Sequence, residues 1–82
     1  MIHVIIISPD EYKQVLCTEE YRGEPVKRIY IEECGITFLF FVVDNGLGEK
    51  KLLIPQNTSM VCNDAILSAV KRLSSGDYTS SL

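Results

Sequence analysis

The most apolar stretch of the chain, Ile36 to Val43, predicts a central β-strand. Seven of its eight residues are apolar, three of them phenylalanine, and turn-forming residues follow at 44–46. Because alternate side chains of a strand point to opposite faces, Phe38 and Phe40 share one face and Phe41 lies on the other. Both faces of this strand are therefore apolar.

The first strand and the first helix are predicted by the amino-terminal residues. Residues 2–7 are apolar except for His3, which is typical of a strand buried on both faces. Ser8-Pro9-Asp10-Glu11 combines an N-cap, a proline at the first helical position and a capping-box glutamate. A short helix should follow, to about Cys17, with an apolar stripe at Tyr12, Val15 and Leu16.

Three consecutive strands are expected in the middle of the chain. A polar loop at 18–25 precedes the alternating segment 26–34, which predicts a strand with one wet face. Gly35 allows a tight reversal into the central strand, and a turn at 44–48 leads to a return strand at 49–54. These segments predict an antiparallel meander.

An amphipathic helix is expected near the carboxyl end, from Met60 to Leu73, ended by Gly76. A start at Asn63-Asp64 is the alternative. Its apolar stripe is Cys62, Ile66, Ala69, Val70 and Leu73. The fold class is therefore α+β: one small domain at 1–75, ordered β-α-β-β-β-α, with a mostly meandering antiparallel sheet packed by this helix, and a flexible tail at 76–82.

Two predicted strands, 2–7 and 36–43, are apolar on both faces, although the short first helix and the longer second one can cover one face more easily than two. Leaving Phe38 and Phe40, or Leu39 and Phe41, in water would forgo several kcal/mol at about 25 cal/mol per Å². Two arrangements stay open. Either the helices lie on opposite faces, or the second face is covered in a symmetric homodimer. We favour the homodimer.

Composition limits the function classes. The net charge is −3 and the basic residues are scattered, which argues against nucleic-acid binding. Three widely spaced cysteines argue against a disulfide framework and favour a reducing, cytoplasmic location. The apolar amino-terminal run is far shorter than the ~20 residues that span a bilayer, so no membrane association is expected.

Candidate chemistry is sparse, and we expect no enzyme, cofactor or metal site. His3 and the cysteines Cys17, Cys34 and Cys62 lack the short spacings of zinc ligands. A single histidine without a supporting motif does not provide a nucleophile, base and orienting group. The fragment 46–51 resembles a phosphate loop only superficially, since it leads into a strand rather than a helix.

The acidic loop around Tyr21 is the plausible docking surface for a basic partner. We therefore expect a non-enzymatic, homodimeric regulator or inhibitor that binds another protein. Accessory proteins of phages and mobile elements that block a host or defence factor have such profiles, in which case the host cytoplasm is the location. The candidate partner-binding residues are Glu19, Glu20, Tyr21, Arg22, Glu24, Tyr30, Phe38 and Phe40.

Two alternatives remain open. A small ligand or nucleotide could bind between sheet and helix near Tyr12, Tyr30 and Lys50-Lys51. Single-stranded RNA binding on the face of Arg28 and Tyr30 ranks last, because Tyr30 is the only stacking aromatic there.

Overall fold

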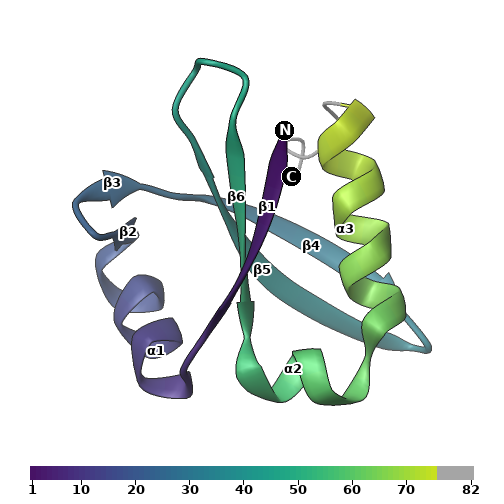
Figure 1. Cartoon of the computed structure of the whole chain (residues 1–82). Coiled ribbons are helices and arrows are strands. Elements are labelled where there is room, and N and C mark those ends of the chain that lie inside the picture. Colours follow the sequence, from purple (N-terminus) through teal and green to yellow (C-terminus); the bar gives the residue numbers. More distant parts are fainter. Residues whose placement is uncertain (76–82) are drawn as a thin grey trace.

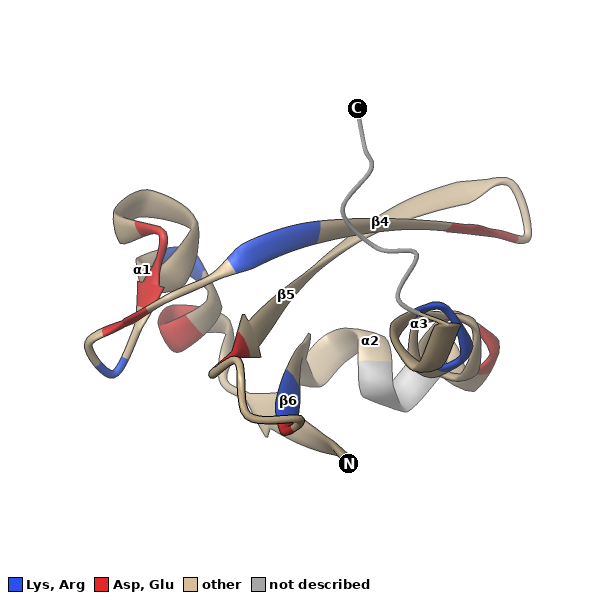
Figure 2. Ribbon diagram, turned by 90° about the horizontal axis from the view of Figure 1, so that it is seen from above, with Lys and Arg blue, Asp and Glu red and all other residues tan. Residues whose placement is uncertain are grey.

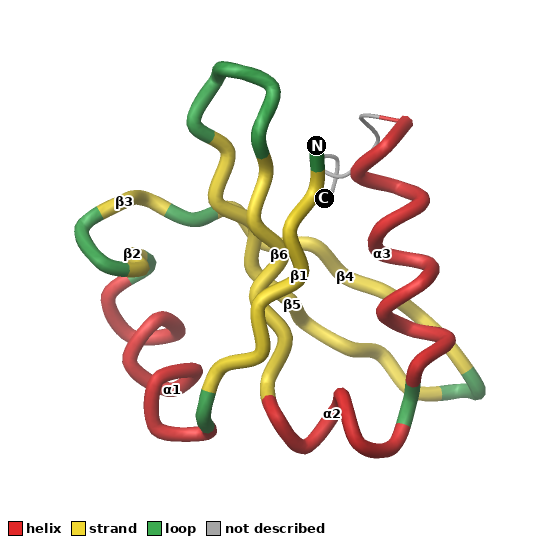
Figure 3. The backbone as a smooth tube through the Cα atoms, viewed as in Figure 1, coloured by secondary structure: helices red, strands yellow, loops and turns green. Residues whose placement is uncertain are grey.

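The computed structural model describes residues 1–75, and the expected flexible tail, 76–82, lies outside the described residues. Four strands form one sheet in the order β1-β6-β5-β4, and the α+β class is confirmed (Figures 1 and 3). The strands of this sheet are β1 (Ile2–Ile7), β4 (Lys27–Glu33), β5 (Ile36–Asp44) and β6 (Lys50–Pro55). Within residues 1–75, a small hairpin and three helices accompany this sheet: β2 (Glu20–Tyr21), β3 (Glu24–Pro25), α1 (Pro9–Thr18), α2 (Gln56–Val61) and α3 (Asn63–Ser75).

The sheet is mixed rather than wholly antiparallel. Strands β4, β5 and β6 form the expected antiparallel meander. Strand β1 pairs with β6 in parallel, with Val4 opposite Leu52 and Ile6 opposite Ile54. Both strands run toward the end of the sheet where a helix begins, α1 after β1 and α2 after β6 (Figure 1).

Helix α1 begins as the sequence predicts. The Ser8 hydroxyl accepts a hydrogen bond of 3.1 Å from the main-chain amide of Glu11, and Pro9 occupies the first turn. The helix ends at Thr18 and is capped by Glu19, whose left-handed backbone lets its amide donate to the carbonyl of Val15 at 2.7 Å. The chain then turns into the β2–β3 hairpin, in a segment expected to be only a loop.

The carboxyl-terminal helical region is divided in two. Helix α2 ends at Val61 and is capped by Cys62, whose backbone is not helical and whose amide donates to the carbonyl of Thr58 at 2.9 Å. Helix α3 then begins at Asn63, which agrees with the alternative start rather than with Met60. The break redirects the chain, so that α3 lies across the sheet while α2 stays close to the end of β6 (Figure 1).

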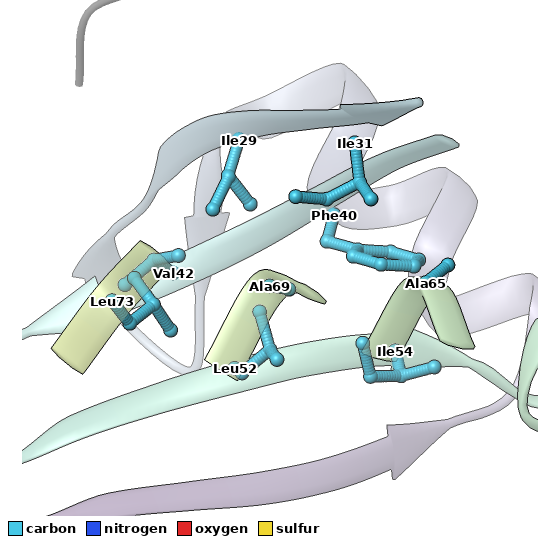
Figure 4. Close-up of a cluster of buried hydrophobic side chains, with 9 residues drawn as sticks. All are labelled: Ile29, Ile31, Phe40, Val42, Leu52, Ile54, Ala65, Ala69 and Leu73. Atoms are coloured by element: carbon cyan, nitrogen blue, oxygen red, sulfur yellow. The ribbon is translucent and has the colours of Figure 1, made fainter. Parts of the chain in front are cut away.

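The larger core lies between α3 and the sheet, on what we call the α3 face (Figure 4). Ala65 and Ala69 have no exposed surface, and their small side chains bring the helix close to the strands. The buried members of this cluster are Ile29, Ile31, Phe40, Val42, Leu52, Ile54, Ala65, Ala69 and Leu73.

The opposite face of the sheet, the α1 face, has a second core beneath α1 and the β2–β3 hairpin. Its buried members are Ile7, Val15, Tyr21, Phe41, Val43 and Leu53. Figure 2 shows α1 and α3 on opposite sides of the sheet. Phe40 and Phe41, which point to opposite faces, are both 0% exposed. The chain itself therefore buries both faces of β5 at its centre, and the apolarity of this strand is not a reason to expect a dimer.

We predict that Ala69→Leu lowers the free energy of unfolding by about 1–3 kcal/mol, because the added atoms have no space between α3 and the sheet. Lys71→Leu, an exposed position of the same helix, should change it by less than about 0.5 kcal/mol. Urea unfolding followed by circular dichroism measures both values. Equal stabilities of the two variants would contradict the close packing of α3.

Candidate interaction surfaces

The acidic loop proposed from sequence is a hairpin fixed against α1. Tyr21 is only 6% exposed and belongs to the core of the α1 face, so it is not available to a partner. The Arg22 guanidinium lies 5.2 Å from the centre of the Tyr21 ring and 3.9 Å from the Glu11 carboxylate. Glu24 forms an ion pair with Lys51 at 3.7 Å. Of the acidic residues in this segment, Glu19 and Glu20 remain the most exposed.

A shallow groove of about 340 Å³ separates α1 from this hairpin. Glu11, Glu20 and Arg22 line it, and Val15 and Tyr21 form part of its apolar wall. Charges of both signs line the groove, and two of them already pair with each other. The groove therefore favours neither an anionic nor a cationic ligand.

The other candidate partner residues separate into exposed and buried ones. Tyr30 lies on the α1 face of β4 and is partly exposed. Phe38 is half-buried and stacks on Phe40 with ring centres 6.0 Å apart. Phe40 is wholly buried and is therefore a core residue rather than a contact residue.

The structure does not bring the proposed ligand-binding residues into one site. Lys50 and Lys51 point to opposite faces of the sheet. The Lys50 ammonium donates to the carbonyl of Leu73 on the α3 face at 3.3 Å, whereas Lys51 pairs with Glu24 on the α1 face. Tyr30 lies close enough to Tyr12 to contribute to the raised pKa of Tyr12.

Tyr12 connects α1 to the sheet. Its hydroxyl donates a hydrogen bond of 2.7 Å to the carbonyl of Leu39, and its ring centre is 5.4 Å from that of Phe41. Burial raises the pKa of Tyr12 above its ordinary value; the nearby Arg28 opposes this increase and Tyr30 adds to it. These contacts give Tyr12 a structural role.

The cysteines and His3 lie apart. Cys17, Cys34 and Cys62 are free thiols, and His3 lies 3.7 Å from Glu49 at the surface. Within residues 1–75 no group of three or more potential ligand side chains could hold a metal ion.

The two edges of the sheet differ in their chemistry. At the β4 edge, the Arg72 guanidinium of α3 donates to the carbonyl of Tyr30 at 2.6 Å, and the Ser68 hydroxyl donates to the Glu33 carboxylate at 2.8 Å. Strand β4 also carries two basic and two acidic residues. Charged side chains and a covering helix are features that prevent further strands from adding to an edge.

Strand β1 lacks these protections along its length. It has no residue with a permanent charge and no proline, and β6 is its only neighbour in the described sheet. Val4 is 43% exposed and Ile6 is 47% exposed, although their cross-strand partners Leu52 and Ile54 are 0% exposed. The cover provided by α3 therefore reaches Ile2, which packs against the core of the α3 face, but does not extend over Val4 and Ile6. We call Val4, Ile6 and the outer main chain of β1 the β1 edge surface.

The sequence does not predict this surface, because the apolar run at 2–7 is typical of a strand buried on both faces. A signal was nevertheless present. A helix about 10 Å wide cannot cover four strands spaced about 4.8 Å apart, so one outer strand must remain partly uncovered on each face. The sequence does not show which strand is outermost.

Comparison of the chain with protein-family models, curated proteins and solved structures finds no match. None of the helices in the described part of the chain is long and apolar enough to span a membrane.

We predict that Tyr12→Phe lowers the free energy of unfolding by about 1 kcal/mol at neutral pH, because the Leu39 carbonyl loses its donor. The raised pKa means that the folded state holds the phenol proton more tightly than the unfolded state. This contribution is complete below pH 10 and is lost as the pH rises beyond it. The stability difference between wild type and Tyr12→Phe should therefore shrink in alkaline buffer.

Urea unfolding at pH 8 and above pH 10 measures this difference. Tyr30→Phe is the control, and at pH 8 it should change the free energy of unfolding by less than about 0.5 kcal/mol, because this side chain is partly exposed. A difference between wild type and Tyr12→Phe that grew with pH would contradict the assignment.

Proposed function

We propose that this chain is a non-enzymatic protein-binding module, of the regulator or inhibitor type, whose contact with other proteins is made at the β1 edge surface. The observation that supports it most is the exposure of Val4 and Ile6 on an edge strand without a charged residue. Such an edge offers main-chain hydrogen bonds and an adjacent apolar surface, which together bind an added strand.

The residues on the uncovered face of each edge strand support the choice of β1 as the contact surface. On the α1 face the strand left open is β4, where Arg28, Tyr30 and Glu32 suit contact with water. On the α3 face the strand left open is β1, where Val4 and Ile6 do not. Burying these two side chains is favourable for any partner that can reach them.

Two further elements of the proposal concern charge and location. Glu19 and Glu20 form an exposed acidic edge of the hairpin and would speed the approach of a basic partner. The exposed free thiols of Cys17 and Cys34 suit a reducing cytoplasm.

The proposal is tested by affinity capture from the source cells with three tagged baits: wild type, Ile6→Lys and Ile36→Lys. Both isoleucines lie in strands and are partly exposed, at 47% and 56%, but Ile36 is on β5, away from the β1 edge. A lysine on an edge strand opposes strand addition. We expect proteins that bind wild type and Ile36→Lys to be lost with Ile6→Lys.

Circular dichroism and urea unfolding of the three baits establish that each is folded. Proteins retained equally by all three folded baits would place the contact away from β1 and would contradict the proposal.

A further inference from the structure

The pairing of β1 with β6 determines which main-chain groups face outward. The amide of Lys50 donates to the carbonyl of Met1 at 3.0 Å. In a parallel ladder the residues of a strand alternate, one directing its amide and carbonyl to the neighbour and the next directing them away. The odd-numbered residues of β1 therefore face β6, and Ile2, Val4 and Ile6 direct their amides and carbonyls to the open edge.

We propose that β1 pairs in antiparallel orientation with β1 of a second copy, about a two-fold axis beside Val4. The four-stranded sheets of the two copies would join into one continuous sheet. This inference rests on the proposed function, since it identifies the strand that the β1 edge surface receives.

The edge is complementary to itself. With Val4 on the axis, each Val4 lies opposite Val4 of the other copy, and each Ile2 lies opposite Ile6. All three residues share the α3 face, so the exposed side chains of Val4 and Ile6 and the partly buried side chain of Ile2 meet those of the other copy. Isologous contacts of this kind are the usual basis of two-fold dimers.

Charge does not oppose this contact. Each chain carries a net charge of −3, so two copies repel each other over most approaches. Residues 2–7 contain no aspartate, glutamate, lysine or arginine, and the β4 edge carries both acids and bases. Pairing through β1 therefore places no side chains of permanent like charge opposite each other within the ladder.

The register follows from the same alternation. Antiparallel hydrogen-bonded pairs need outward-facing groups from both strands, so an even-numbered residue must lie opposite an even-numbered one. Centring the axis on His3 would leave Ile6 without a partner and place two imidazoles together. Centring it on Ile5 would place Ile2 opposite Ser8, which lies outside the strand as the cap of α1. Only the register centred on Val4 pairs Ile2, Val4 and Ile6 together.

The oligomeric state is measured by sedimentation equilibrium of the full chain at micromolar concentrations. Wild type and Ile36→Lys should form dimers, and Ile6→Lys should sediment as a monomer. A monomeric wild type would overturn this inference. If capture by the same chain still depended on Ile6, the proposed function would stand, and the occupant of the edge would be a different protein.

The register is tested by single cysteines introduced at positions 3, 4 and 5, in a background of Cys17→Ser, Cys34→Ser and Cys62→Ala. Residues opposite each other in a hydrogen-bonded antiparallel pair have Cα atoms about 5.5 Å apart, which a disulfide can bridge. Only Val4→Cys should form a disulfide-linked dimer on mild oxidation. Linkage through His3→Cys or Ile5→Cys instead would overturn the register.

A second measurement keeps the native cysteines. Val4→Lys and Val4→Glu should each be monomeric, because like charges would meet on the axis. Mixing the two variants should produce a heterodimer, detected by native mass spectrometry. Failure to associate on mixing, with both variants folded by circular dichroism, would overturn the placement of Val4 on the two-fold axis.

Discussion

The structure depends on covering both faces of a four-stranded sheet with little helix. Strands spaced about 4.8 Å apart make this sheet wider than one helix of about 10 Å diameter can cover. The chain places α3 on one face and α1, with the β2–β3 hairpin, on the other. The central strands β5 and β6 are thereby covered twice, and each edge strand is left partly open on one face.

The uncovered faces of the two edge strands, β4 and β1, carry different kinds of residue. Strand β4 alternates isoleucines beneath α3 with polar residues on its open side, and the guanidinium of Arg72 occupies its outer edge. Strand β1 instead presents Val4 and Ile6 to water. A domain of this size buries only about 60% of the surface of its unfolded chain, so apolar surface left exposed is a substantial fraction of what could stabilise it. This contrast connects the packing of the fold to the proposed contact.

Local signals in the sequence predicted local structure well. The Ser8-Pro9 cap, the meander through Ile36–Val43 and the apolar stripe of α3 all depend on neighbours in the chain, and each is confirmed. The burial of Tyr21 and Phe40 could not be predicted, because it depends on which helix covers which face. The exposure of Val4 depends on strand order. A continuous apolar run is the same in sequence whether its strand is central or at an edge.

The proposed dimer rests on β1 rather than on the two apolar faces of Ile36–Val43, because the chain itself covers both faces at the centre of that strand. Strand β1 is attached to the sheet by a single parallel ladder, a pairing slightly weaker per residue than an antiparallel one. Its contacts with β6 also join residues far apart in sequence, such as Ile2 and Lys50. An added antiparallel ladder would hold β1 from both sides, so association would stabilise an edge strand that has one ladder in the monomer.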